Sequence, residues 1–368
     1  MIDVAAGAQF SCALRVEGSA FCWGANYVGQ LGDGTNTPSA VAVPVSGNHT
    51  FTDVAIGNTT ACGLTTSGQL YCWGQNSSGL LGPSLAGLPF SNVPVLTSGG
   101  LTFRSISMGL STVCGIAADD LSYCWGSNSM GQFGNGVTGG DSTVPVLNTS
   151  SGALGFTSIH SGFFANCAQG QAGIYCWGQA NTLGNGSTSN ALVATPTLAA
   201  GGANYALIDT GIFNSCGLSS AGDAFCWGYQ FSGELANGTT TGSSPTPTTV
   251  QGGLRFTTID LNSHNSFIGS TCGVVPAGGA WCWGSNQFGQ LGAPSAEVCT
   301  SGSTNYACSS APLEVSGGLT FTSVSVGMTH ACGATPGREV YCWGANNNGQ
   351  LGDGTTTNST APVRVLGL

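Results

Sequence analysis

Cysteine is the residue type whose number and spacing in this sequence point most clearly to chemistry. There are sixteen cysteines, and six pairs of them lie ten residues apart. Two residues at that spacing face each other across a β-hairpin, close enough for a disulfide. We therefore expect eight disulfides, which are Cys12/Cys22, Cys62/Cys72, Cys114/Cys124, Cys167/Cys176, Cys216/Cys226, Cys272/Cys282, Cys299/Cys308 and Cys332/Cys342.

Zinc ligation by thiolates is the competing interpretation of these cysteines. Structural zinc sites use cysteines two to four residues apart, and the chain has no Cys-x-x-Cys. Disulfides in this number form in an oxidising compartment, so we expect an extracellular or cell-surface location. Residues 1–20 lack the basic start and apolar core of a signal peptide. The chain would then be a mature or excised segment of an exported protein.

Other residue types give little sign of catalysis. The sequence has no nucleophile elbow and no phosphate-binding loop, and we identify no paired acids at one repeat position. The four histidines fall at different repeat positions, and His330 fits a structural hydrogen-bonding role better than a catalytic one. We predict no catalytic, cofactor-binding or metal-binding residues and expect that the protein is not an enzyme. An active site assembled from several repeats is an alternative that the sequence leaves open.

The charge balance limits the partners that the chain can bind. Charged residues make up only 5% of the sequence, and the formal net charge is -10, with five arginines and no lysine. Such a surface repels phosphate backbones and anionic lipid. The sequence also has no apolar run long enough for a membrane helix. We therefore expect neither nucleic-acid binding nor direct membrane insertion.

The elements that position the cysteines repeat along the whole chain. The tripeptide Cys-Trp-Gly occurs seven times, at 50- to 60-residue intervals, beginning at Cys22, Cys72, Cys124, Cys176, Cys226, Cys282 and Cys342. A fixed period on this scale is typical of a repeat architecture. We predict one domain, residues 1–368, of seven units at about 1–50, 51–102, 103–155, 156–205, 206–255, 256–320 and 321–368.

Each unit contains four short strand-like segments separated by turn signals. A fourth segment with proline, such as Val43-Pro44-Val45, suits the outer edge of a sheet because proline cannot donate to a ladder. Seven units of four antiparallel strands predict an all-β, seven-bladed β-propeller. We expect the ring to be closed by N- and C-terminal strands that share a blade. The tryptophans of Cys-Trp-Gly, at one position in every unit, are expected to pack between blades.

The units resemble the repeat of the regulator of chromosome condensation family. The resemblance covers the chain and is clearest in Phe321 to Gly327, Val340 to Gly344 and Asn346 to Gly352. It implies a seven-bladed propeller, but little about activity, because the family includes a nuclear exchange factor for a small GTPase, plant ultraviolet-B photoreceptors and a secreted β-lactamase inhibitor. The photoreceptor pattern of Trp, Arg and His after the first strand is absent here. A lysine-free, disulfide-rich chain also does not suit chromatin, so a secreted binding protein is the favoured interpretation.

Alternating strand direction places the loops after the first and third strands of every unit on one face, the variable-loop face. Aromatic side chains on such loops either anchor a partner or fold down over the rim. We predict partner-binding residues at Phe10, Tyr27, Phe163, Phe164, Phe213, Phe231, Phe288 and Met328. The predicted function is an extracellular scaffold, within a larger surface protein or assembly, that binds a protein or a glycan without a cofactor. A structural surface or filament module, and an enzyme with a site at the propeller axis, are the alternatives.

Overall fold

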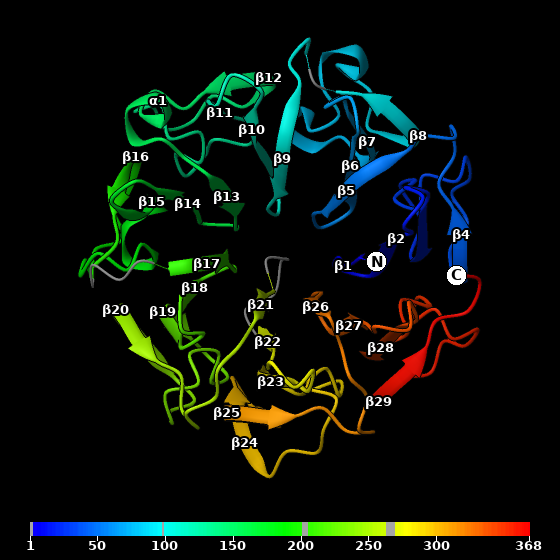
Figure 1. The fold of residues 1–368 in the computed structure, drawn as a ribbon, viewed down its shortest axis with the longest axis vertical. Helices are drawn as coiled ribbons and strands as arrows, with labels where there is room; N and C mark the ends of the chain where they lie inside the picture. The colour runs from blue at the N-terminus through cyan, green and yellow to red at the C-terminus, as the bar shows by residue number, and fades with distance from the viewer. Residues whose placement is uncertain (1–2, 98, 201–204, 263–268) are drawn as a thin grey trace.

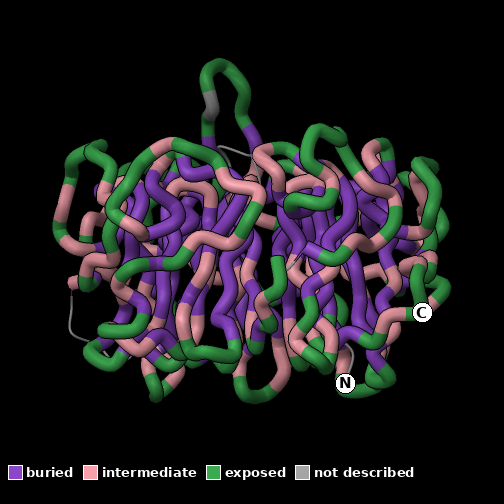
Figure 2. Tube along the Cα trace, turned by 90° about the horizontal axis from the view of Figure 1, so that it is seen from above, coloured by how far each residue is buried: buried purple, intermediate pink, exposed green. Residues whose placement is uncertain are grey.

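The protein is a seven-bladed β-propeller, as the sequence predicts. The computed structural model describes residues 3–97, 99–200, 205–262 and 269–368. Seven antiparallel sheets stand around a central axis, each with its first strand innermost and its later strands toward the rim (Figure 1). Seen from the side, the buried strands form the layer between the two faces of the ring, and exposed loops lie on both faces (Figure 2). No helix within the described ranges is long and apolar enough to cross a membrane.

The strands follow the order of the repeats. Blade one contains β1 (Asp3–Ala6), β2 (Phe10–Leu14), β3 (Ala20–Gly24) and β4 (Ser39–Pro44). Blade two contains β5 (Phe51–Ile56), β6 (Thr60–Thr65), β7 (Leu70–Gln75) and β8 (Phe90–Leu96). Blade three contains β9 (Phe103–Met108), β10 (Thr112–Ala117), β11 (Ser122–Gly126) and β12 (Ser142–Leu147). Blade four contains β13 (Ser158–Ser161), β14 (Ala165–Gly170), β15 (Gly173–Gln179) and β16 (Leu192–Leu198).

The remaining blades complete the ring. Blade five contains β17 (Tyr205–Thr210), β18 (Asn214–Ser219), β19 (Ala224–Gln230) and β20 (Gly242–Thr249). Blade six contains β21 (Thr258–Leu261), β22 (Ser270–Val274), β23 (Ala280–Ser285), β24 (Glu297–Ser301) and β25 (Thr304–Glu314), in which β24 forms an additional hairpin with β25. Blade seven contains β26 (Ser323–Val326), β27 (His330–Ala334), β28 (Val340–Gly344) and β29 (Ser359–Arg364). Short helices α1 (Ser151–Leu154), η1 (Ser77–Gly79), η2 (Pro83–Leu85) and η3 (Ala180–Thr182) lie in the connections.

The hairpin between the second and third strands of each blade carries a disulfide. Cys12 lies directly opposite Cys22 in the register of β2 and β3, and their Cα atoms are 4.0 Å apart. Gly18 supplies the left-handed residue of the turn, with φ of 88°. The same hairpin recurs in all seven blades, and Cys299–Cys308 joins β24 to β25 with a Cα separation of 5.8 Å. The eight disulfides of the structure are the eight pairs expected from the spacing.

The hydrophobic core lies between neighbouring blades, around the seven tryptophans of Cys-Trp-Gly. Each of these side chains is completely buried, as expected. The indole N–H of Trp73 donates to the Gln30 carbonyl of the preceding blade at 3.0 Å. Equivalent bonds are made by five other tryptophans. Trp227, at the junction of blades four and five, has no acceptor for its N–H among the described residues.

The predicted closure of the ring is wrong in one respect: no blade is shared by the two terminal strands. β1 pairs with β2 through Asp3 and Leu14, whereas β29 pairs with β28 through Arg364 and Tyr341. Each unit supplies all four strands of its own blade, so no strand has to be exchanged. Blade seven meets blade one through the contact used elsewhere in the ring, in which Trp23 Nε1 donates to the Gln350 carbonyl at 2.9 Å.

The start of blade five also differs from the sequence interpretation. The segment that begins at Ala206 lacks the phenylalanine that opens most first strands, which predicts a weak start. In the structure Tyr205 takes that place, at the beginning of β17, and is buried. Its ring lies 6.0 Å from the ring of Trp227, much as Phe51 lies 5.9 Å from Trp73. A tyrosine therefore packs where the other blades use phenylalanine.

Candidate functional site

Four of the predicted partner-binding residues form one aromatic cluster at the junction of blades four and five. Phe163 and Phe164 follow β13, Phe213 follows β17 and Phe231 follows β19, so all four come from variable-face loops. Ring centroids are 4.2 Å apart between Phe163 and Phe164, 4.8 Å between Phe164 and Phe213, and 5.4 Å between Phe213 and Phe231. Tyr229 lies 6.3 Å from Phe231 and extends the cluster. We call these five residues the aromatic cluster.

The aromatic cluster is partly exposed although it is large and apolar. Phe231 keeps 38% of its surface accessible, and Phe163, Phe164 and Phe213 are half-buried. Offset and tilted rings at these distances attract one another, which fixes their orientation before any ligand arrives. In blade two the positions of Phe163 and Phe164 hold Asn58 and Thr59 instead. The cluster is thus a local feature of blades four and five, not part of the repeat.

Phe10 does not belong to the contact surface, which corrects one of the predictions. It is the first residue of β2 rather than part of a loop, and its side chain is completely buried in the core of blades one and two. The absence of a side chain at Gly7 makes room for its ring, since a Cβ there would lie 2.7 Å from Phe10 Cε1. Phe10 therefore occupies the repeat position of Ala165 and Asn214, and not that of the half-buried residues of the aromatic cluster.

Three other predicted residues lie apart from the aromatic cluster. Tyr27 is 63% exposed, and its hydroxyl donates to Asn348 Oδ1 of blade seven at 3.2 Å. Phe288 and Met328 are half-buried in the loops of blades six and seven. Within the described ranges, no ring contact connects Tyr27 or Phe288 to the cluster. Phe267, also considered for this face, lies outside the described residues.

A buried carboxylate lies beneath the aromatic cluster. Glu234 Oε2 accepts the backbone N–H groups of Phe231 and Ser232 at 2.8 and 2.7 Å, and Glu234 Oε1 accepts that of Gly269 at 3.0 Å. Burial raises the pKa of Glu234 above its ordinary value, while the bonds from these N–H groups oppose the rise. Glu234, Phe213 and Phe231 also line a small cavity of about 10 Å³.

Glu234 was not among the predicted residues, although its repeat position carries a signal. Four other units have glutamine at the corresponding position, namely Gln30, Gln132, Gln290 and Gln350. In blade one the amide oxygen of Gln30 accepts the N–H of Val28 at 3.0 Å, so the glutamine supports its own loop. Glutamate keeps this role and adds a second acceptor oxygen. Glu234 uses it to hold Gly269 of blade six, which ties the neighbouring loops together.

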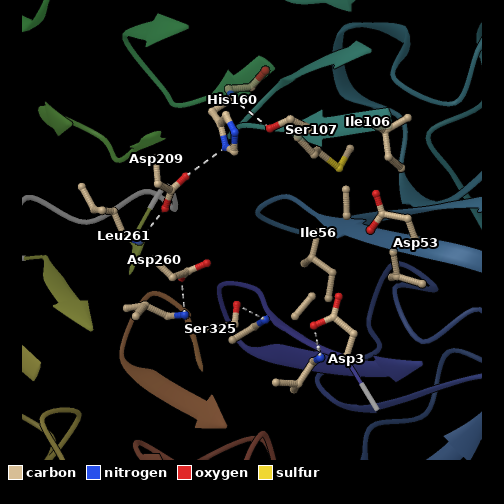
Figure 3. Close-up of a pocket in the computed structure, with 18 of the residues that line it drawn as sticks. Asp3, Asp53, Ile56, Ile106, Ser107, His160, Asp209, Asp260, Leu261 and Ser325 are labelled. Atoms are coloured by element: carbon tan, nitrogen blue, oxygen red, sulfur yellow. Dashed lines mark hydrogen bonds and ion pairs between the residues drawn. The ribbon is translucent and has the colours of Figure 1, made fainter. Parts of the chain in front are cut away.

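A second concave feature is the axial funnel, a cavity of about 360 Å³ lined by the first strands (Figure 3). Asp3, Asp53, His160, Asp209 and Asp260 are among its lining residues. These acids stand out in the sequence only when the first strands are aligned position by position. Asp3 and Asp53 then share one repeat position, four residues before Gly7 and Gly57. Asp209 and Asp260 share another, two residues before Gly211 and Asn262. The expectation that no acids pair at one repeat position is therefore wrong.

Polar residues at the repeat position of Asp209 and Asp260 connect neighbouring blades. Asp209 Oδ2 accepts the N–H of Leu261 at 2.7 Å, and Asp260 Oδ1 accepts that of Val326 at 2.6 Å. Serine takes the same role in two other blades. Ser107 Oγ accepts the N–H of Ser161 at 2.9 Å, and Ser325 Oγ accepts that of Ala6 at 3.1 Å. Innermost strands have an unpaired edge, and these side chains satisfy part of it. Their geometry therefore has a structural explanation.

Electrostatic strain accompanies this arrangement. Burial, and next the neighbouring Asp209 carboxylate, hold the pKa of Asp260 well above its ordinary value. Burial, and next the Asp3 carboxylate, raise the pKa of Asp53 to about 6. The imidazole Nδ1 of His160 lies 3.7 Å from Asp209 Oδ1. Among the described residues, no three His, Cys, Asp or Glu side chains converge as metal ligands.

Comparison with known proteins assigns the chain to a family. The regulator of chromosome condensation (RCC1) repeat matches residues 1–30, 51–80, 103–132 and 321–350 in one form, and 17–64, 277–333 and 339–368 in a second. Together these matches cover more than half of the sequence. The chain belongs to the RCC1 repeat family.

Relatives share the fold across widely different contexts. The ultraviolet-B receptor UVR8 of Arabidopsis thaliana is 26% identical over 299 residues, which is 76% of this chain and 61% of UVR8. The human E3 ubiquitin-protein ligase HERC2 is 24% identical over 338 residues, 77% of this chain but only 7% of HERC2. Yeast RCC1 (Prp20), solved bound to Kap60, superposes with a TM-score of 0.80 at 16% identity, covering 96% of this chain and 84% of that one. The chain thus spans less than two thirds of the curated relatives it matches.

Proposed function

We propose that this propeller is an extracellular binding protein that holds a partner protein on its variable-loop face, centred on the aromatic cluster. The observation that carries the proposal is the continuous contact of Phe163, Phe164, Phe213 and Phe231 on a partly exposed surface. Aromatic residues that are rigid before binding lose little side-chain entropy, and Tyr, Trp and Phe are enriched in the buried centres of protein interfaces.

Three further observations support this assignment. Yeast RCC1 was solved bound to another protein, and a second structure of it was described together with its binding to Gsp1p and histones. The cluster lies on loops held by a rigid, disulfide-linked scaffold, where binding residues collect. The eight disulfides suit an oxidising environment outside the cell. A glycan partner is a narrower alternative, for which the cluster would serve as a stacking platform.

The test compares two triple variants in capture of a partner from extracellular extracts of the source. In the first, Phe163, Phe164 and Phe213 become serine, which removes the centre of the aromatic cluster. In the matched control, the exposed rim residues Val144, Leu147 and Leu192 become serine, which removes comparable apolar surface elsewhere. Both sets are accessible, so both proteins should fold, as circular dichroism and thermal melting would verify.

We expect the wild type and the rim variant to capture the same partner and the aromatic variant to lose it. A photo-reactive amino acid placed at Phe231 should then cross-link to that partner. Equal capture by all three proteins would refute the assignment of the binding site. If free saccharide released the captured partner and no protein became cross-linked, the partner would be a glycan and not a protein.

A further inference from the structure

Every blade has an aromatic residue immediately before the cysteine of its third strand. These residues are Phe21, Tyr71, Tyr123, Tyr175, Phe225, Trp281 and Tyr341. They lie toward the tight-turn face, opposite the variable-loop face, where the second and third strands of each blade are joined. They therefore form a second aromatic set, separate from the aromatic cluster.

In six blades the chain itself supplies a partner for this aromatic residue. The Arg15 guanidinium lies over the Phe21 ring, 4.2 Å from its centroid, and the His49 ring lies 4.1 Å from Tyr71. The hydroxyl of Tyr123 donates to Asp119 at 2.8 Å. The remaining partners are Phe156 for Tyr175, Tyr205 for Phe225 and Glu339 for Tyr341.

Blade six is the exception. Trp281 packs one side against the core of blades five and six, but in the described part of the chain its ring meets no other ring or cation, and its N–H meets no acceptor. It borders an open pocket of about 570 Å³, within the range of ligand sites, with Leu254, Pro276 and Leu319 in the walls. Small residues such as Gly279 leave this pocket unfilled.

The pocket also contains a carboxylate. Glu314 lies directly opposite Trp281 in the register of β23 and β25, and it is exposed. A Cβ at Gly279 would lie 3.6 Å from both Glu314 Oε1 and Trp281 Nε1, so the carboxylate and the indole border the same space. Among the described residues, no cation pairs with Glu314. The other charged residue of the pocket, Arg255, has its Nε 3.6 Å from Asp223 Oδ1, which offsets its charge.

We propose that this pocket, lined by Trp281 and Glu314, is a binding site for an organic cation, a guanidinium or alkylammonium group. The indole is the aromatic side chain with the strongest attraction for cations, and a carboxylate beside it adds a charge-assisted hydrogen bond. Blade one provides an internal precedent, since Arg15 fills the corresponding position over Phe21. In blade six the described part of the chain supplies the aromatic residue and the acid but not the cation.

The ligand is thus a cationic side chain of another protein or a free organic cation, and the shared chemistry is what the site recognises. A net charge of -10 favours the approach of such ligands. The site lies on the tight-turn face, so it does not depend on the proposed function of the aromatic cluster. Failure of one assignment leaves the other intact.

Tryptophan fluorescence gives a selective readout of this site. Of the eight tryptophans, the seven in Cys-Trp-Gly are completely buried, and Trp281 is half-buried. The wild-type protein is titrated at low salt with Nα-acetyl-arginine amide and with tetramethylammonium. The neutral isostere Nα-acetyl-citrulline amide and methyl α-glucoside serve as comparison ligands. We expect saturable quenching of the accessible fraction by the two cations and no saturation with the neutral compounds.

Two variants locate the binding. Glu314→Gln removes the charge and keeps the shape, and we expect it to weaken cation binding about fivefold to tenfold. Gly279→Gln fills the pocket with the residue that blade two carries at this position, Gln69, and should abolish binding. Asp119→Asn, which alters an acid on the same face of blade three, is the control and should bind like the wild type.

Absence of saturable quenching in the wild type would overturn the proposal. So would equal binding of the arginine and citrulline compounds, because the site would then recognise shape rather than charge. Binding of the glucoside in preference to the cations would overturn it in favour of a sugar site. A cation affinity unchanged in both Glu314→Gln and Gly279→Gln would place the cation elsewhere.

Discussion

Replacement of Asp53 in the axial funnel should stabilise the protein at neutral pH. Burial raises the pKa of Asp53 to about 6 from an ordinary value of 3.8, so ionisation of this group opposes folding. The protonated carboxyl contributes its stability below pH 3.8, and that contribution is lost as the pH rises through about 6. Asp53→Asn is neutral at every pH and avoids this loss.

The size of the effect follows from the difference between the two pKa values. About 1.36 kcal/mol per pKa unit gives an upper limit of about 3 kcal/mol above pH 7. Asp53 is half-buried and lines an open funnel, which reduces the expected gain to about 1 to 2 kcal/mol. For a chain of 368 residues the melting temperature should rise by about 1 to 3 °C.

The assay is thermal melting at equal scan rates at pH 7.5 and at pH 3.5, with disulfides intact. Asp53→Asn should exceed the wild type at pH 7.5 and match it at pH 3.5. The control Asp120→Asn removes the exposed ion pair to Arg104 at 3.1 Å and should change the melting temperature little at either pH. An Asp53→Asn protein that melts with the wild type at pH 7.5, or gains more at pH 3.5, would refute the reasoning.

Three further predictions concern the joints between blades and the disulfides. Trp283→Phe removes the hydrogen bond from the indole to the Glu234 carbonyl at 2.9 Å. It should lower the free energy of unfolding by about 1 to 2 kcal/mol more than Trp227→Phe, which breaks no such bond among the described residues. Urea unfolding would compare the two variants, and equal losses of stability would contradict the role given to this bond. Replacing Cys272 and Cys282 by alanine opens a hairpin within a blade and should cost about 2 to 3 kcal/mol by the chain-entropy relation. The bridge between Cys299 and Cys308 lies in an added hairpin. Replacing these two cysteines should therefore leave the melting temperature nearly unchanged but make residues 297–308 sensitive to limited proteolysis. A large drop in melting temperature would contradict this view.

The repeats allowed most of the fold to be predicted, because the same constraint acts seven times. Cys12 and Cys22 face each other only in one hairpin register, and Trp73 recurs at a position that must pack between blades. The closure of the ring was predicted less well, because sequence cannot distinguish a strand that completes its own blade from one that is exchanged. The partners of Tyr205 and Phe10 depend on where a strand begins within one or two residues, which local patterns do not fix.

The candidate sites were predicted only where the signal was local. Phe163 and Phe164 are adjacent in sequence and replace polar residues of other blades, so the sequence alone indicates them as candidates. Asp53 and Asp260 contribute to the axial funnel from blades two and six, and only an alignment of first strands would have connected such residues. Trp281 does not stand out in the sequence, because it occupies a place where every blade has an aromatic residue. Trp281 differs from its counterparts because none of the described residues pairs with its ring, and only the folded chain reveals this.

The indole N–H of Trp227, which has no acceptor among the described residues, makes one joint between blades different from the other six. Six of the seven joints are fastened by an indole and a carbonyl, whereas the joint between blades four and five lacks this fastening among the described residues. The rings of Phe164 and Phe213 bridge that same joint from above. A ligand that contacts both rings would add contacts across this joint. Binding of the ligand would therefore raise the force needed to separate blades four and five.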